Sequence, residues 1–314
     1  MGLFQRPASG PVLSHRLAGL TAAATLALIL VGGLVTNTGS ALAVPDWPTT
    51  FGYNMFLYPW SKMVGGILYE HSHRLLGSLV GCLTIALALA LWLTEPRRWL
   101  RALGGLAVVL VVIQGVLGGL RVVLLQDTIA IFHGCLAQTF FALTVSIAVF
   151  TSRGWREEPP AVAGGRLRAL GLAAVGLLYV QIVFGALLTH AGVVALHLVG
   201  AAAVFTVVPM VTARARATGA RAIARPAALL LALLLLQLVL GVGAYLARFS
   251  PIGLPGGQAT VLALPVAHRL VAAMILGAAL TLALSLLRAR RAPAPEGAQA
   301  IEGSFRPLTM ETVR

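Results

Sequence analysis

Residues 69–93 read YEHSHRLLGSLVGCLTIALALALWL, and the 19 positions after Arg74 in this stretch carry no charged side chain. About 20 apolar residues are enough for a helix to cross a bilayer, so the stretch predicts a membrane-spanning helix. The rest of the 314-residue chain is similar, since 59% of its residues are hydrophobic and 10% are charged. Soluble domains carry about 25% charged residues, so a water-soluble fold is excluded.

Eight apolar runs of this kind follow one another along the chain, and together they predict an all-α membrane protein. The loops between them are short, which leaves no room for a sizeable soluble domain. The expected spans are residues 16–36, 69–93, 99–120, 129–151, 167–189, 193–212, 226–247 and 264–287.

The charge distribution predicts the orientation of these spans. The chain has 23 Lys and Arg against 9 Asp and Glu, a net charge of +14. In a soluble protein this excess would suggest a nucleic-acid partner, but here the basic residues form short clusters between spans embedded in membrane lipid. Eighteen of them fall on the side of the termini, and the positive-inside rule therefore predicts cytoplasmic termini in a cell (inner) membrane. The five on the other side are Lys62, Arg74, Arg121, Arg248 and Arg269.

An internal repeat divides the chain into two halves. Residues 32–39, GGLVTNTG, resemble residues 185–192, GALLTHAG, and residues 114–118, QGVLG, resemble residues 237–241, QLVLG. Gln181 and Gly185 echo the second pattern. We therefore expect two tandem four-helix bundles. The predicted segments are an N-terminus at 1–15, a half at 16–151, a linker at 152–166, a half at 167–287 and a disordered tail at 288–314.

Four histidines recur with this repeat. His73, His133, His197 and His268 each lie about four residues after the start of an even-numbered expected span. At about 1.5 Å per residue they share one depth, roughly 6 Å below the outer helix ends. The repeat relates His73 to His197 and His133 to His268.

One histidine from each of two helices at matched depth is how a helix bundle holds a haem through both axial positions. Two halves then predict two haem sites. The alternative is that these histidines join helices by hydrogen bonds alone. Small residues nearby would let a wide ring approach the backbone, namely Gly77, Gly81, Gly118, Gly119 and Gly185.

A carboxylate distinguishes the two predicted sites. Glu70 lies three residues before His73, on the same helix face, and no acidic residue precedes His197 in this way. This predicts one reactive site and one that only exchanges electrons, although Glu70 also suits the first turn of a helix. His15, His71 and His190 are expected at membrane interfaces, with His190 near the second site.

Four arginines lie at the expected outer ends of the helices, where haem propionates need cationic partners. They are also placed where arginine side chains reach from the membrane toward water. These candidate propionate contacts are Arg74, Arg121, Arg248 and Arg269.

With these residues in view, the chain resembles the haem A synthase family over about residues 14–287. The resemblance rests on Glu70-His71-Ser72-His73-Arg74, on His133, on His197, on His268-Arg269 and on the outer-loop run TGSALAVPDWP at residues 38–48. The loop also resembles a subset of this family that lacks cysteines there. Cys82 and Cys135 both lie inside apolar spans, so a thiol role in the outer loop is not expected.

The resemblance implies a function for each predicted site. Members of this family oxidise a methyl group of haem O to a formyl group, which gives the haem A of terminal oxidases. His73 and His133 would hold the substrate haem O, with Glu70 as the catalytic carboxylate, and His197 and His268 would hold a haem b cofactor. Haem O synthase is the implied donor, and terminal oxidase assembly the implied destination.

Two other functions remain open on sequence grounds. A dihaem b-type electron carrier between a quinol and an outer acceptor would need the four histidines but not Glu70. A transporter built from two repeats would place its site near the bilayer midplane, which fits the shallow histidines least well.

Overall fold

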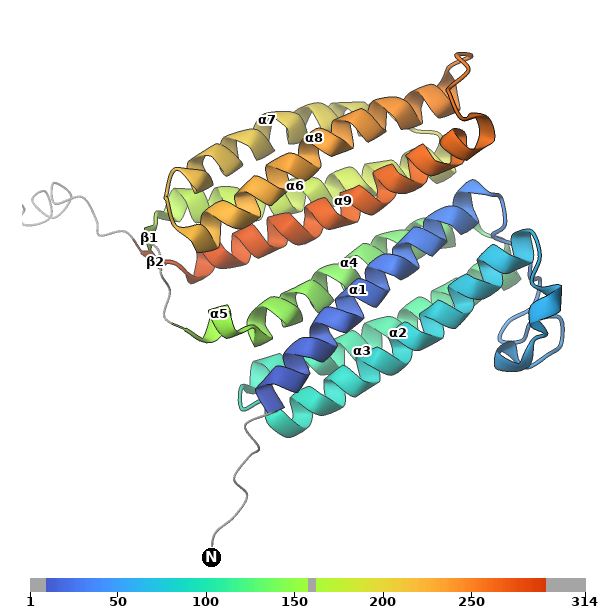
Figure 1. Ribbon diagram of the computed structural model, residues 1–314, viewed down its shortest axis with the longest axis horizontal. Helices are drawn as coiled ribbons and strands as arrows, with labels where there is room; N and C mark the ends of the chain where they lie inside the picture. Colours follow the sequence, from blue (N-terminus) through green and yellow to red (C-terminus); the bar gives the residue numbers. More distant parts are fainter. Residues whose placement is uncertain (1–9, 158–161, 292–314) are drawn as a thin grey trace, which may run out of the picture.

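The computed structural model describes residues 10–157 and 162–291, and eight long helices dominate it (Figure 1). The long helices are α1 (Gly10–Asn37), α2 (Gly66–Thr94), α3 (Arg98–Leu124), α4 (Asp127–Thr151), α6 (Gly165–Ala191), α7 (Val194–Arg216), α8 (Arg221–Phe249) and α9 (Gly257–Arg288). The short elements are the 3-10 turns Met55–Leu57 and Trp60–Lys62, helix α5 (Arg153–Arg156), and strands β1 (Val162–Ala163) and β2 (Arg290–Arg291).

The eight long helices confirm the predicted spans, because each is long and apolar enough to cross a membrane. Their ends differ from the expected ones where a helix continues into polar sequence. Helix α8 begins at Arg221 rather than at residue 226, and α9 begins at Gly257 rather than at residue 264. The expected bounds followed apolar side chains, whereas backbone hydrogen bonding continues past the hydrocarbon until a local signal stops it. At α9 that signal is Gly256, with φ 86°.

The helices pack as two rings of four. In the N-terminal ring each of α1 to α4 packs against the next and α4 returns to α1, and helices α6 to α9 form the same circuit (Figure 1). Three further pairs join the rings, namely α1 with α9, α4 with α6, and α4 with α9. The repeat equates α1 with α6 and α4 with α9. Exchanging the two halves therefore turns the α1–α9 pair into the α6–α4 pair, and it leaves the α4–α9 pair unchanged.

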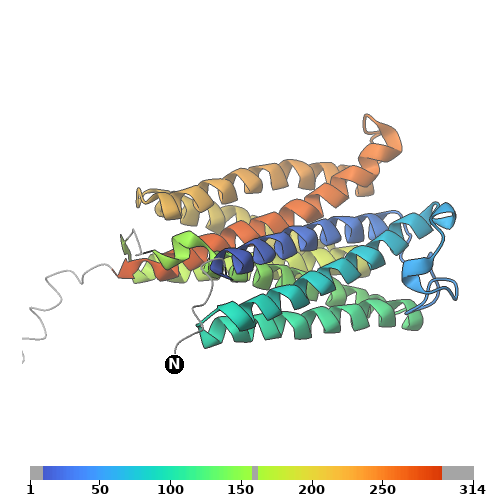
Figure 2. The ribbon, with the colours of Figure 1, turned by 60° about the horizontal axis from the view of Figure 1, so that its bottom comes forward.

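Helix α9 lies at the centre of this arrangement, between α8 and the N-terminal ring (Figure 2). A Cβ on its Gly277 would lie 3.3 Å from Phe141 on α4, so a small residue is needed there. Nearby, the hydroxyls of Thr139 and Tyr179 lie 2.9 Å apart and link α4 to α6. Small residues and interhelical hydrogen bonds are the usual means by which helices associate in lipid.

Both described ends of the chain lie at the same end of the molecule, as eight spans require (Figure 1). Strand β1, in the predicted linker, pairs in parallel with β2, which follows α9. The disorder predicted for residues 288–314 falls mostly on 292–314, which lie outside the described residues. Of the predicted N-terminal segment 1–15, residues 10–15 already belong to α1.

Candidate functional site

The structure brings His73 and His133 together at one end of the N-terminal ring. Their ring centroids lie 6.5 Å apart, at an interplanar angle of 76°. His73 comes from α2 and His133 from α4. The Nδ1 atoms of both histidines are buried and have no hydrogen-bond partner. Buried polar atoms are normally paired, but no protein group pairs with these two nitrogens. Each imidazole can therefore bind a partner from outside the chain.

The C-terminal ring repeats this arrangement. His197 on α7 and His268 on α9 have ring centroids 6.2 Å apart, with an interplanar angle of 72°. The Nδ1 atom of His268 is also buried and without a partner. The four predicted histidines thus form two matched pairs, one in each half.

A glycine on the preceding helix lies against each of the four imidazoles. A Cβ on Gly32 would lie 3.0 Å from the His73 ring, and one on Gly241 would lie 3.0 Å from the His268 ring. The corresponding distances are 3.3 Å for Gly118 and His133, and 3.4 Å for Gly185 and His197. At Gly32, Gly118 and Gly241 a Cβ would press on the histidine, whereas at Gly185 it would make an ordinary van der Waals contact.

Gly118 and Gly185 were among the small residues predicted from sequence, and Gly32 and Gly241 were missed. The signal that finds them is the repeat itself, because it aligns Gly32 with Gly185 and Gly118 with Gly241. Gly77 and Gly81, which were predicted, have no atom near their Cβ positions.

The residues present fit a haem in each half. Two imidazole nitrogens that share one metal ion each lie about 2 Å from it, which separates the ring centroids by about 6 Å. The observed separations of 6.5 and 6.2 Å match this value. The unpartnered ring nitrogens, and the glycines that lie against each imidazole, agree with the same interpretation.

The expectation that each histidine lies about four residues into its helix is wrong. His197 lies three residues after the first residue of α7, but His268 lies eleven residues after Gly257. The helices begin at different heights, so the distance from a helix start does not measure depth. The two pairs are nevertheless formed as the repeat predicts.

Glu70 is held in a buried ion pair. Its side chain accepts a hydrogen bond from the Arg74 guanidinium at 2.7 Å and another from the backbone N–H of Val44 at 2.9 Å. Only 4% of Glu70 is exposed. Arg74 also donates to the carbonyl oxygens of Val44, Asp46 and Thr49. The Arg74 guanidinium thus joins Glu70 to the outer loop, and its predicted contact with a haem propionate stays a prediction.

The loop at residues 38–65, which we call the outer loop, covers the end of the N-terminal ring (Figure 1). The indole of Trp47 occupies the space that a Cβ on Gly119 of α3 would fill. His71 was expected at the membrane interface, but the loop buries it to 1% exposure. Its Nδ1 lies 3.2 Å from the Thr50 hydroxyl, and its ring packs on Tyr58. A long-range contact with a loop leaves no periodic signal, so sequence reasoning missed it.

Asp46 folds the outer loop back on itself. Its carboxylate accepts hydrogen bonds from the backbone N–H groups of Phe51 at 2.7 Å and Gly52 at 2.9 Å, and from the Thr49 hydroxyl. Partial burial opposes ionisation, but these hydrogen bonds outweigh it and hold the pKa of Asp46 below its ordinary value of 3.8. The ionised carboxylate is thus the form that orders this turn.

The turn should therefore lose order only in strong acid. Because the folded pKa of Asp46 is lowered, its contribution is present above the ordinary pKa of 3.8 and is lost as the pH falls through the lowered value. We expect hydrogen-exchange protection of the Phe51 and Gly52 amides to fall in that range. An Asp46→Asn variant should have low protection at every pH, and equal protection in both proteins would contradict this role.

Basic residues from both rings gather at the same end of the molecule. Arg269 on α9 approaches Gly33 on α1, where a Cβ would lie 3.8 Å from its guanidinium, and its Nη2 lies 3.5 Å from the Thr189 hydroxyl. Arg121 and Arg248 interact electrostatically with Arg269, and His190 interacts with all three. Asp127 interacts electrostatically with Arg121 and His190, and Glu70 interacts with Arg121. Three cations gathered in this way favour binding of an anion.

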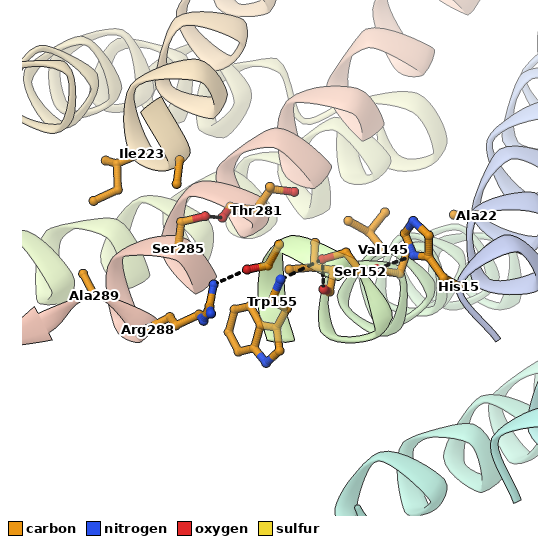
Figure 3. A pocket seen from close by; sticks show the side chains of 14 residues that line it. His15, Ala22, Val145, Ser152, Trp155, Ile223, Thr281, Ser285, Arg288 and Ala289 are labelled. Carbon is orange, nitrogen blue, oxygen red and sulfur yellow. Dashed lines mark hydrogen bonds between the residues drawn. The ribbon is translucent and has the colours of Figure 1, made fainter. Parts of the chain in front are cut away.

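A cavity of about 410 Å³ opens between the rings at the opposite end (Figure 3). His15, Trp155 and Arg288 line it together with apolar residues of α4, α8 and α9. The Nδ1 of His15 lies 3.1 Å from the carbonyl oxygen of Ala148. At about 1.5 Å per residue, the 17 residues from His268 to Ser285 place this cavity roughly 25 Å from the histidine pairs. It is therefore separate from the candidate haem sites.

Comparison with known proteins identifies the family of the chain. Residues 15–195 match the COX15-CtaA family model, which is described as "Cytochrome oxidase assembly protein". The chain belongs to this family. The matched residues contain Glu70, His73 and His133, so the histidine pair of the N-terminal ring lies within the match. His197 and His268 lie beyond it.

Curated relatives of this chain carry the name "Heme A synthase". One from Alkalihalophilus pseudofirmus is 32% identical over 142 residues, which are 44% of this chain and 46% of the relative. One from Shouchella clausii is 32% identical over 148 residues, 46% of this chain and 47% of the relative. One from Halalkalibacterium halodurans is 28% identical over 175 residues, 54% of this chain and 57% of the relative. The chain thus spans about half the length of the relatives it matches.

Proposed function

We propose that this protein is a haem A synthase, an oxidoreductase that converts a methyl group of haem O into a formyl group and so makes haem A for terminal oxidases. The observation that carries the proposal is the buried Glu70–Arg74 pair beside His73, in one half of a molecule that otherwise repeats its histidine pairs. The names of the curated relatives support the same activity.

In this proposal the two histidine pairs have different tasks. His73 and His133 hold haem O as the substrate, and His197 and His268 hold haem b as the resident cofactor. A haem b bound by His197 and His268 would supply one-electron redox chemistry there. The substrate half is the one that carries Glu70, because oxidation of a methyl group releases protons as well as electrons.

Glu70 is placed to serve this reaction. Glu70 and His73 are three residues apart on α2, so both lie on the same side of the helix. The carboxylate is held by Arg74 and by the Val44 N–H, which fix its orientation before substrate arrives. A preoriented negative charge can accept a proton or stabilise positive charge that develops on the substrate ring.

The outer loop supports the same assignment of the two halves. Residues 38–65 pack on α3 through Trp47, whereas α8 and α9 are joined only by the short segment 250–256. A cover that excludes water matters where a reactive intermediate forms, and less where a haem only transfers electrons. The covered half is therefore the substrate half.

Arg121, Arg248 and Arg269 are the proposed partners of the haem propionates. They gather from both rings at the end that holds the histidines. The excess of arginines at the opposite end supports cytoplasmic termini, with both haems toward the outer face of the cell membrane. Haem O synthase is the proposed donor of the substrate, and terminal oxidase assembly receives the product.

The test is haem extraction and chromatography on protein purified from a host that makes haem O. Wild type should carry haem b together with haem O or haem A. Glu70→Gln should retain haem b and lower haem A formation by about 100-fold, the scale of a lost acid–base group. Glutamine has the same shape and keeps one acceptor oxygen for Arg74, but its NH2 group cannot accept from the Val44 N–H, so the change removes the charge and one of the two hydrogen bonds.

Glu95→Gln is the matched control, because Glu95 is also a buried carboxylate bound to an arginine. Its partner Arg97 lies 2.7 Å away, at the other end of the molecule. This variant should make haem A at the wild-type level. If wild type carried haem b in both halves and made no haem A, the synthase assignment would fail and a dihaem electron carrier would replace it.

A further inference from the structure

The cavity between the two rings is polar at one end and apolar at the other. Three helices border it, and each supplies two lining residues seven positions apart, which is about 10 Å along a helix. These pairs are His15 and Ala22 on α1, Ser152 at the end of α4 and Val145 within it, and Arg288 and Thr281 on α9 (Figure 3). In each pair the histidine, serine or arginine lies nearer the end of the molecule where α1 begins and α9 ends. The cavity therefore has the polarity of an amphipathic molecule that lies along the helices.

The inner wall of the cavity is apolar although it includes hydroxyl groups. The Thr281 hydroxyl donates to the carbonyl oxygen of Gly277, and the Ser285 hydroxyl donates to that of Thr281, both at 2.8 Å. Both hydroxyl protons are thus used within α9, and Ala22 and Val145 add only carbon to this wall. Apolar cavities in proteins stay free of water. A hydrocarbon chain is therefore the group that suits this part of the 410 Å³ cavity.

The polar end of the cavity is cationic. The Arg288 guanidinium donates to the carbonyl oxygen of Gly154 and lies over the Trp155 ring, 5.3 Å from its centroid. A guanidinium has five N–H donors, so Arg288 keeps donors for a further partner. Among the described residues that line the cavity there is no Asp or Glu, and the nearby Glu157 pairs with Arg153 at 3.1 Å. This end therefore favours an anionic group.

We propose that the cavity binds an anionic phospholipid, with the phosphate at Arg288 and one acyl chain between the rings. Basic pockets between membrane-spanning helices are suited to anionic lipid headgroups. The lining residues come from α1 and α4 on one side and from α8 and α9 on the other, so the bound lipid joins the two rings. The site lies roughly 25 Å from the histidine pairs, and the inference does not depend on the proposed function.

The experiment is native mass spectrometry of the purified full-length protein, titrated in detergent with phosphatidylglycerol. Phosphatidylcholine with the same acyl chains tests the charge of the headgroup, and glycerol phosphate tests whether a free anion is enough. Phosphatidylglycerol should bind about fivefold more tightly than phosphatidylcholine, the scale of one arginine at an anionic headgroup. Glycerol phosphate should not displace it.

Two variants test the headgroup and the acyl chain separately. Arg288→Gln removes the cation and should weaken phosphatidylglycerol binding by about fivefold, while phosphatidylcholine binding stays nearly unchanged. Ala22→Phe fills the inner part of the cavity and should weaken binding of both lipids by roughly tenfold, which corresponds to about two methylene groups no longer buried. Arg101→Gln is the matched control. Arg101 also lies over a tryptophan ring, 5.6 Å from the centroid of Trp92 at the same end of the molecule, but it does not line the cavity.

Several outcomes would overturn the inference. Equal weakening by Arg288→Gln and Arg101→Gln would mean that the charge of the whole face holds the lipid. Equal binding of the two lipids, or displacement by glycerol phosphate, would exclude an anionic phospholipid as the occupant. Unchanged lipid binding in Ala22→Phe would show that no acyl chain enters the cavity, and this variant keeps Arg288 in place. A quinone that co-purifies with wild type in place of lipid, and is lost from Ala22→Phe, would assign the cavity to the quinone instead.

Discussion

Gly32→Val should empty the substrate site and leave the cofactor site filled. A Cβ on Gly32 already lies 3.0 Å from Cε1 of His73, and valine adds two methyl groups beyond it. Overpacking of this kind costs about 1–3 kcal/mol and is relieved by movement of the side chain in contact. The His73 ring would then leave its position opposite His133. We expect haem A formation to fall at least tenfold, and haem to remain in the C-terminal half alone.

Gly19→Val on the same helix is the matched control, because a Cβ at Gly19 meets no atom within 4 Å. Helix propensity changes equally in both variants, so only the contact with His73 differs. The measurement is the molar ratio of extracted haem to protein in each variant, taken before and after purification. Equal haem content in the two variants would show that Gly32 does not seat a haem ligand.

Gly119→Leu should release the outer loop from α3. The Trp47 indole occupies the space of a Cβ at this position, so leucine and Trp47 cannot both remain. The sequence has a single lysine, Lys62, and it lies in this loop. A lysine-specific protease therefore reports loop opening by one cut. We expect cleavage to accelerate at least tenfold, and haem A formation to fall with it as water enters the substrate half.

Gly115→Leu, one turn earlier on α3, is the control because no atom lies within 4 Å of its Cβ position. It should be cleaved at the wild-type rate and keep its activity. Slow cleavage of Gly119→Leu would mean that the loop is held by the hydrogen bonds of Arg74 and Asp46 without help from Trp47.

The membrane-spanning helices were predictable because the bilayer imposes a simple rule on sequence. Every backbone polar group must be satisfied within the span, so a long apolar run has little choice but to form a helix. That rule says nothing of residues outside the hydrocarbon. The early start of α9, the short helix α5 and the pairing of β1 with β2 depend on local backbone hydrogen bonds that apolar periodicity does not report.

The histidine pairs were predictable because ionisable residues are rare in spans and these four follow the repeat. Their surroundings were less so. Gly32 and Gly241 look like ordinary small residues until the repeat is extended to them. The contacts of Glu70 with Val44 and of Trp47 with Gly119 join a loop to a helix over many residues. Such contacts are set by the folded shape and leave no spacing that sequence reasoning can read.

The contacts between the two rings also bear on how such a protein can arise. Exchanging the two halves turns the contact of α1 with α9 into that of α6 with α4, and it leaves the contact of α4 with α9 unchanged. A surface that pairs with a second copy of itself in this way is what a two-fold symmetric homodimer requires. An ancestral chain of four helices would bury the same surface by dimerising, with one haem site per subunit. Fusion of two gene copies would then release each half from the demands of symmetry, which allows Glu70 and the outer loop to stand in one half alone.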